Sequence, residues 1–205
     1  MTARPASDAP PTLLPAPHPV VLLPPHAVVV DLSAPPDRLI LPDHPWQIGR
    51  YDELRGIYTT PLFTDGPAPR DLHVGLDLGG PAGVAVHAWA AGEVEHAGFN
   101  PAAGDYGHVL VCAHPVGDRV LYVLLGHLSA ESLRRSPVGR RFAAGEVLGW
   151  LGEPHENGGW PPHLHVQLCW ERPETHDLPG AVALADRAAA LRRYPDPRLI
   201  LGPVY

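Results

Sequence analysis

Glycine and proline are so frequent in this sequence that long helices cannot dominate its fold. The 205 residues include 21 glycines and 27 prolines, the two residue types that fit helix and strand interiors least well. Average proteins contain roughly 12% of the pair, about half of the share found here. Such an excess occurs in low-complexity chains and in β domains with many turns. An apolar fraction of 45% favours a folded domain.

The first 45 residues differ in composition from the rest of the chain. They hold twelve of the 27 prolines, which predicts a proline-rich extended arm over residues 1–45 and a compact domain over residues 46–205. Two β-prone pieces, residues 20–23 and 27–32, could pair with the edge of the domain, whereas most of the arm is expected to be loosely held. We expect no catalytic group in this arm.

The domain shows the pattern of an antiparallel sheet or barrel. Short β-prone runs alternate with Gly, Pro and Asn turns at intervals of roughly 8 to 15 residues. A short helical turn is expected in SAESLRR, and an Ala- and Arg-rich stretch predicts a C-terminal helix at about residues 181–193. The predicted strands cover residues 73–78, 84–88, 92–97, 108–113, 119–125, 147–151 and 163–170.

Charge, cysteine content and hydropathy narrow the classes of protein that fit. The formal net charge is −7 and all 15 basic residues are arginines, which argues against a nucleic-acid-binding surface. Cys112 and Cys169 lie in apolar stretches, where we expect buried free thiols. No apolar run reaches the roughly 18 residues of a membrane span, and the N-terminus lacks the features of a secretory signal. We therefore expect a cytoplasmic protein without a membrane span.

Two of the predicted strands carry metal-ligand side chains on a single face. In HVGLDL, strand alternation places His73 and Asp77 opposite the apolar residues, with Gly75 between them leaving room for a substrate backbone. In PHLHVQL, His163 and His165 share one face in the same way. Each strand therefore directs its polar face to a cleft and its apolar face to the core.

A further histidine, His127, lies at the end of a third β-prone apolar run. His127 follows the strand-like residues of LLGHLS, where an unpaired polar group would be costly to bury. Imidazole and carboxylate groups suit Zn²⁺, and a catalytic zinc needs three protein ligands with one open position. An HxH or HxxxD pair by itself is a weak signal, because single strand histidines are more often surface or hydrogen-bonded core residues. The joint occurrence of all three motifs predicts a metal site.

The order and spacing of these motifs resemble those of the M23 metallopeptidases, the lysostaphin and LytM type of peptidoglycan endopeptidase. The resemblance implies that Zn²⁺ is held by His73, Asp77 and His165, and that His127 and His163 form the catalytic pair beside the metal. It also implies an all-β fold, an antiparallel split barrel or sandwich with the cleft across the sheet. The segments that carry it are HVGLD, PAGVAVHAWAAGEVEHAG, YGHVLVCAH, YVLLGHLS, AAGEVLGWLG and PHLHVQL.

The activity implied by the resemblance is zinc-dependent endopeptidase activity on a short peptide that contains Gly or D-residues, such as a peptidoglycan cross-link or fragment. Because the sequence has no HExxH motif, His127 and His163 rather than a glutamate would act as acid and base. Peptidoglycan cross-links lie outside the membrane, whereas the N-terminus predicts a cytoplasmic protein. Either export follows a route that the sequence does not display, or the substrate is a cytoplasmic peptide.

Three positions depart from the family pattern or leave a role open. Gln167 stands where many relatives have Glu, a change that we expect to tune the site without removing it. No tyrosine directly precedes the Gly-His pair, since Tyr122 lies five residues before His127, which leaves the substrate contacts there open. His155, in the loop before HxH, could line the cleft.

Two other classes of protein were weighed. A non-catalytic M23-like binding or regulatory module would keep the fold, but such modules usually lack some of the five metal and catalytic residues, and the complete set counts against this class. A cupin-like barrel also uses HxH. It would need Glu four or five residues after the second histidine, where Cys169 and Trp170 stand, and it is set aside.

Overall fold

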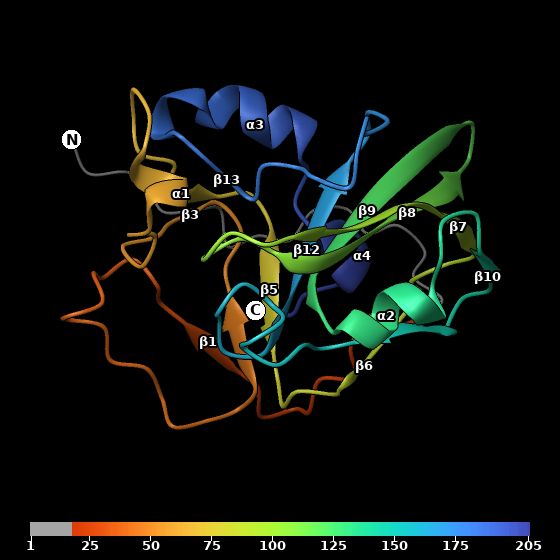
Figure 1. The fold of residues 1–205 in the computed structure, drawn as a ribbon, viewed down its shortest axis with the longest axis horizontal. Coiled ribbons are helices and arrows are strands. Elements are labelled where there is room, and N and C mark those ends of the chain that lie inside the picture. The colour runs from red at the N-terminus through yellow and green to blue at the C-terminus, as the bar shows by residue number, and fades with distance from the viewer. Residues whose placement is uncertain (1–17) are drawn as a thin grey trace.

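The centre of the protein is an eight-stranded mixed β-sheet (Figure 1). The computed structural model describes residues 18–205, so residues 1–17 of the predicted arm lie outside the described part. Neighbouring strands run antiparallel except β1 and β2, which are parallel. Across the sheet the strands are β1 (Val28–Val30), β2 (Gln47–Gly49), β5 (Leu76–Gly79), β12 (His163–Cys169), β9 (Arg119–Leu128), β8 (Gly107–Val116), β7 (Gly92–Asn100) and β10 (Arg141–Phe142).

Two small sheets and a few short helices complete the described part of the chain. The small sheets are β13 (Ala181–Val182) with β4 (Leu72–His73) and β3 (Glu53–Leu54), and β11 (Val147–Trp150) with β6 (Ala85–His87). The helices are α1 (Pro61–Thr64), α2 (Ala130–Arg135), α3 (Arg187–Arg193) and α4 (Arg198–Leu201), with a 3-10 turn η1 (Leu184–Asp186) before α3. None of these described helices is long and apolar enough to cross a membrane. The mostly β composition predicted from the turn-rich sequence is confirmed.

The strand predicted for residues 73–78 is interrupted. β4 ends at His73 in the three-stranded sheet, and β5 begins at Leu76 in the eight-stranded sheet. Between them Val74 donates its backbone N–H to Gly180 O at 3.0 Å. The two halves of the segment hydrogen-bond to different partners, so tertiary pairing overrides the continuous alternation that the sequence suggested.

Two further expectations about the fold are corrected and one is confirmed. The parallel β1–β2 pair makes the sheet mixed rather than wholly antiparallel. The helix expected at about residues 181–193 begins only at Arg187, because β13 takes the first two residues to pair with β4 and η1 follows. Cys112 and Cys169 are buried free thiols, as predicted.

Part of the predicted arm, within residues 20–30, packs against the domain. Val20 and Val21 are only 2% and 4% exposed, and Val20 O accepts a hydrogen bond from His87 N at 2.8 Å. The pairing expected for residues 27–32 is present as β1. The expectation that the arm is loosely held is wrong for Val20 and Val21, which belong to the core cluster, whereas most of residues 31–45 are exposed. The domain boundary itself stays a prediction.

Apolar side chains cover both faces of the large sheet. On β12, Leu164 and Leu168 are fully buried in one cluster, whereas His165 and Gln167 point to the opposite face. That second face is packed by a separate apolar cluster that includes Ala190 of α3, and α3 lies above the sheet in Figure 1. The alternation predicted for HxH is therefore present, and it places the histidines on the face covered by α3.

His114 is a buried imidazole on β8, outside the HxH and HxxxD motifs. It is 2% exposed, its ring lies against Trp89 and Phe142, and its Nδ1 donates to Ala91 O at 3.3 Å. Burial lowers the pKa of His114 from 6.5 to about 4. Between about pH 4 and pH 6.5 the His114 ring therefore binds a proton in the unfolded chain but not in the folded chain.

We therefore expect His114 to make the protein less stable as pH falls from 6.5 to about 4. The free energy of unfolding should drop by about 3 kcal/mol over this window on account of His114. Urea unfolding at stepped pH measures this slope, and His114→Gln should remove most of that contribution. The same replacement of the exposed His155 is the control and should leave the slope unchanged; equal slopes in all three proteins would contradict the assignment.

Candidate metal centre

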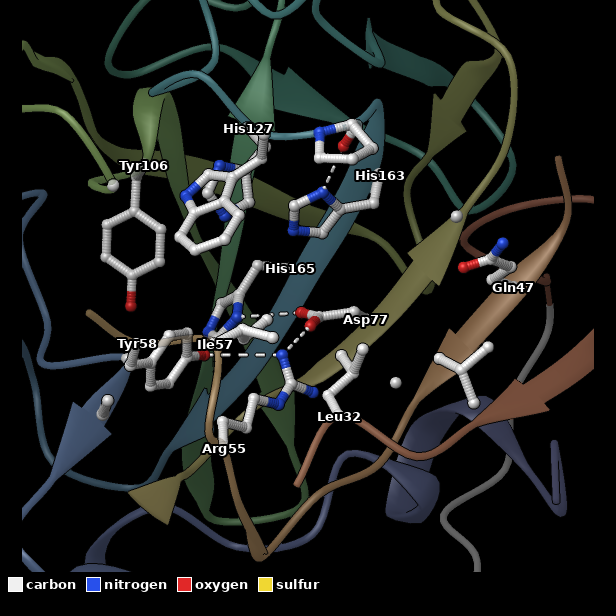
Figure 2. Close-up of a pocket in the computed structure, with 18 of the residues that line it drawn as sticks. Leu32, Gln47, Arg55, Ile57, Tyr58, Asp77, Tyr106, His127, His163 and His165 are labelled. Carbon is white, nitrogen blue, oxygen red and sulfur yellow. Dashed lines mark hydrogen bonds and ion pairs between the residues drawn. The ribbon is translucent and has the colours of Figure 1, made fainter. Parts of the chain in front are cut away.

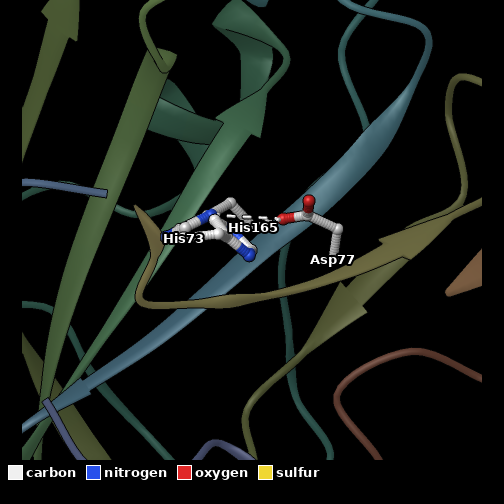
Figure 3. A group of neighbouring side chains, drawn as sticks. All are labelled: His73, Asp77 and His165. Atoms are coloured by element: carbon white, nitrogen blue, oxygen red, sulfur yellow. Dashed lines mark hydrogen bonds and ion pairs between the residues drawn. The ribbon is translucent and has the colours of Figure 1, made fainter. Parts of the chain in front are cut away.

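Three ligand-type atoms converge where β4, β5 and β12 meet. His73 ends β4, and Asp77 of β5 is the direct register partner of His165 on β12. His73 Nε2 lies 3.0 Å from His165 Nδ1 and 3.4 Å from Asp77 Oδ1. His165 Nδ1 lies 3.2 Å from the same carboxylate oxygen, and all three residues are buried (Figure 3). The structure therefore brings the three predicted metal ligands together.

Hydrogen bonds on the far side of each ring decide which nitrogen faces the centre of this group. His73 Nδ1 donates to Arg50 O at 2.9 Å, and His165 Nε2 donates to Gln167 Oε1 at 3.0 Å. Because a carbonyl oxygen only accepts, each ring carries its proton there and turns a lone pair toward Asp77 Oδ1. Burial lowers the pKa of His73 to about 4, which keeps that ring neutral near pH 7.

This donor set fits a metal cation. Two imidazole lone pairs and a carboxylate oxygen facing one another at 3.0 to 3.4 Å repel unless a proton or a cation lies between them. Ligands of a tetrahedral Zn²⁺, bound at about 2.0–2.1 Å, lie about 3.3 Å apart. Nitrogen and oxygen donors of this kind suit Zn²⁺, so the spacing and the chemistry of the three residues both match.

Arg55 occupies the second oxygen of the Asp77 carboxylate. Arg55 is 4% exposed, and its Nη1 donates to Asp77 Oδ2 at 2.5 Å while its Nε lies 3.3 Å from Glu53 Oε2. A Cβ at Gly49 would lie 2.7 Å from Arg55 Nη2 and 3.1 Å from Asp77 Oδ2, so any larger residue there would displace this pair. Burial raises the pKa of Asp77, but the charge that His73 gains when it is protonated at low pH, and the charge of Arg55, outweigh this effect and hold the pKa of Asp77 well below 3.8. Asp77 thus offers one oxygen, Oδ1, to a metal.

Loss of Arg55 is expected to destabilise the metal-free protein strongly. Arg55→Gln leaves the buried Asp77 carboxylate without its arginine and Glu53 with Arg50 alone, at 3.6 Å, and breaking a buried pair in this way costs about 3–5 kcal/mol. Urea unfolding measures the loss, and added Zn²⁺ should recover part of it because the cation compensates Asp77. Arg134→Gln, which breaks the exposed pair with Glu131, is the control and should cost less than about 1 kcal/mol. Similar losses in both variants would contradict this account.

His127 and His163 lie beside the predicted ligands (Figure 2). Their ring centroids are 4.2 Å apart, and the His127 ring lies 6.2 Å from that of His165. His127 Nδ1 donates to Asn157 O at 2.8 Å and His163 Nδ1 donates to Pro161 O at 2.7 Å. Burial lowers both pKa values, that of His127 well below 6.5. Each ring is therefore neutral with an unprotonated Nε2 that can accept a proton.

The backbone of His127 is strained. Its φ of 61° lies in the left-handed region, which is uncommon for any residue other than glycine and costs of order 1 kcal/mol or more. Two hydrogen bonds hold this conformation: His127 N donates to Tyr106 O and Gly152 N donates to His127 O, both at 2.9 Å. Strain of this kind concentrates at functional sites, and here it aims the imidazole at the neighbouring histidines.

Tyr106 is a site residue that sequence reasoning missed. Its ring lies 5.6 Å from that of His127 and 5.1 Å from that of His165, and its hydroxyl donates to Leu178 O at 2.9 Å. No tyrosine directly precedes the Gly126–His127 pair in the sequence, and Tyr122, five residues before His127, does not line the cavity. Gly126, directly before His127, could have indicated that a large side chain packs there, because a Cβ at this position would lie 2.7 Å from the Tyr106 ring.

Two expectations about neighbouring residues are corrected. Gly75 does not leave room for a substrate backbone, because a Cβ there would lie 2.2 Å from Cε1 of His165; the space is taken by the ligand ring. His155 is exposed and lines a separate small hollow with Phe99 and Pro101 rather than the cavity of the metal centre. Gly75 lies within the HxxxD motif and His155 in the loop before HxH, and only the packing shows which atoms they face.

One cavity of about 760 Å³ holds this chemistry. Asp77, His127, His163 and His165 line it together with Tyr106 (Figure 2). Its volume lies within the range of roughly 300–1,000 Å³ that is usual for small-ligand sites. A ligand in this cavity would contact the metal centre and the two neutral histidines at the same time.

A model of the family described as peptidase family M23 matches residues 71–176, just over half of the chain. The protein belongs to peptidase family M23. The family predicted from the motifs is confirmed, and the chain is an M23 metallopeptidase with His73, Asp77 and His165 as its candidate zinc site.

Several solved M23 structures are similar to this chain. The catalytic domain of the prophage-encoded M23 protein EnpA from Enterococcus faecalis is 21% identical over 71% of this chain and 93% of its own length, with a TM-score of 0.46. The lysostaphin catalytic domain from Staphylococcus simulans is 22% identical over 61% and 86%, with a TM-score of 0.40. A zinc-containing peptidase from Vibrio cholerae is 25% identical over 48% of this chain, with a TM-score of 0.39, and the match spans 27% of its length. No curated protein matches the chain.

Proposed function

We propose that this M23 protein is a zinc-dependent endopeptidase that hydrolyses a bond in a short peptide containing Gly or D-residues, such as a peptidoglycan cross-link or fragment. The observation that carries the proposal is the arrangement of three metal-directed lone pairs beside two neutral imidazoles in one cavity. Family membership supports the reaction type. The substrate class rests on the resemblance of the motifs to those of peptidoglycan endopeptidases.

In this proposal His73 Nε2, Asp77 Oδ1 and His165 Nδ1 hold Zn²⁺. Bound zinc supplies a Lewis acid for the scissile carbonyl and lowers the pKa of water from about 15.7 toward about 7. Gln167 Oε1 and Arg50 O keep the two ligand imidazoles in the required tautomer. Gln167 stands where many relatives have Glu. A neutral acceptor increases the electron density of the imidazole less than a carboxylate does, and this is the tuning that we expect from Gln167.

His127 and His163 perform the proton transfers. Nε2 of one ring accepts a proton from the attacking water, since each Nδ1 keeps its proton in a bond to a backbone carbonyl. The protonated ring then donates to the leaving amine. Burial lowers the pKa of both rings and holds them neutral before substrate binds. Positioned histidines of this kind typically accelerate such a step about 10²–10⁴-fold.

The location of the protein is also part of the proposal. The sequence predicts a cytoplasmic protein, and this location would make a wall-derived fragment or another cytoplasmic peptide the substrate. An exported protein would instead meet intact cross-links. Pulse-labelled cells separated into cytoplasmic, periplasmic and membrane fractions distinguish the two cases by where the chain is recovered.

A cleavage assay tests the function directly. Zinc-loaded protein is incubated with pentaglycine and with D-alanine-containing wall peptides, and new termini are identified by mass spectrometry. We expect defined cleavage that disappears in Asp77→Asn, which retains the size of the side chain but weakens the metal site. A protein that binds one zinc per chain and cleaves neither these peptides nor peptides with a large apolar residue beside glycine would instead be the non-catalytic binding module.

A further inference from the structure

The cavity of the metal centre continues into an apolar chamber. Four aliphatic side chains, Leu32, Leu39, Leu41 and Ile57, line the same cavity as Asp77. Figure 2 shows Leu32 and Ile57 next to the Arg55–Asp77 pair. The family match begins at residue 71, so these walls are formed by chain that precedes the matched region. We refer to the four aliphatic residues as the apolar chamber.

Hydrogen bonds hold the chamber wall in place. Leu32 O accepts a bond from Gly56 N at 3.0 Å, which ties the wall to the turn after β3. Gln47 Nε2 on β2 donates to Pro42 O at 3.0 Å and to His44 O at 2.8 Å, which ties the following loop to the sheet. A wall fixed before a ligand arrives loses less conformational entropy on binding than a mobile loop would.

Residues 39–41 show that the wall has an inner and an outer side. Leu39 and Leu41 line the cavity, whereas Ile40 between them is 92% exposed and does not line it. Leu41 is 40% exposed, so an aliphatic surface stands open to water at the edge of the cavity. Covering such a surface with an apolar ligand group is favourable in proportion to the area removed from water.

We propose that the apolar chamber is the subsite for a bulky aliphatic or aromatic side chain of the substrate, next to the bond that is cleaved. This inference rests on the proposed peptidase function. A peptide with glycine on both sides of that bond would leave the chamber unfilled. We therefore expect a peptide with glycine or a D-residue on one side of the bond and a large apolar residue on the other to be cleaved better than pentaglycine.

Amino-acid hydroxamates test the chamber without catalysis. The hydroxamate group binds the zinc and the side chain samples the cavity, so calorimetry on the zinc-loaded protein compares leucine hydroxamate with glycine hydroxamate. We expect leucine hydroxamate to bind at least about tenfold more tightly, the usual effect of a few methylenes in an apolar pocket. Leu39→Ser and Leu41→Ser should each reduce this ratio about threefold or more, with one zinc per chain retained.

Ile40→Ser is the matched control, since it makes the same kind of change in the same segment outside the cavity. Its ratio should equal that of the unchanged protein. A ratio near one in the unchanged protein, failure of either hydroxamate to bind, or the same loss in Ile40→Ser as in Leu39→Ser would overturn the proposal.

Peptide cleavage separates failure of the chamber from failure of the proposed function. Quenched-fluorescence peptides that carry Gly, Leu or Phe at one position beside glycine are assayed with the same preparation. A leucine preference of the hydroxamates without cleavage of any peptide would support the chamber and reject the peptidase function. Equal cleavage of all three peptides with equal hydroxamate binding would reject the chamber and leave the peptidase function standing.

Discussion

Replacement of His73 by alanine is expected to remove the metal and the peptidase activity together. His73 Nε2 lies 3.0 Å from His165 Nδ1 and its other nitrogen is held by Arg50 O, so no other described side chain stands in its place. Without it only two ligands remain, fewer than any ordinary zinc site has. We expect the zinc content to fall from about one per chain to near zero, and kcat/KM to fall about a thousand-fold or more.

Inductively coupled plasma mass spectrometry of the purified variant measures the metal, and the peptide assay measures the activity. His155→Ala is the matched control because its ring is exposed and outside the cavity; it should keep both zinc and activity. Circular dichroism and urea unfolding verify that His73→Ala is folded. A folded His73→Ala variant that retains one zinc per chain would show that the metal is held elsewhere.

The second large effect is expected at His127, where activity should be lost while the metal stays. The variant of choice is His127→Asn, because asparagine adopts a positive φ more readily than alanine and His127 has φ 61°. Asparagine has no group that can accept the proton of the attacking water. We expect kcat to fall about 10²–10⁴-fold with little change in KM.

Metal content and stability separate this loss from misfolding. The zinc content of His127→Asn should remain about one per chain, since His127 is not among the three grouped ligands. The same experiment with His163→Asn should give a comparable loss if the two rings, 4.2 Å apart, act as a unit. A kcat within threefold of the unchanged protein in His127→Asn would remove that residue from the mechanism.

The candidate ligands could be predicted from sequence because strand periodicity is local. On β12 the alternation of HLHVQL places His165 and Gln167 opposite Leu164 and Val166, as the pattern requires. The HxxxD segment supplies two of the three grouped residues although residues 73–78 are not one strand. Its two polar side chains still meet because β5 pairs with β12 in a register that sets Asp77 against His165.

The residues that support the site could not be predicted in the same way. Arg55 lies far from Asp77 in sequence, and its contact depends on the pairing of β2 with β5 and on the missing side chain at Gly49. Tyr106 reaches the histidines from the loop before β8, through the space left by Gly126. Contacts of this kind depend on the tertiary fold, and the local periodicity of the sequence does not predict them.

By itself the sequence determined the turn-rich β class, the family motifs and the five polar side chains of the centre. Turn residues, motif spacing and strand alternation all involve residues close together in the chain, so they can be recognised without the fold. The tertiary structure decided what each of these side chains faces. It showed that Gly75 makes room for His165, that Asp77 has one oxygen occupied by Arg55, and that residues 32–57 add an apolar wall. These outcomes depend on register, packing and buried charge, which arise only when distant segments meet.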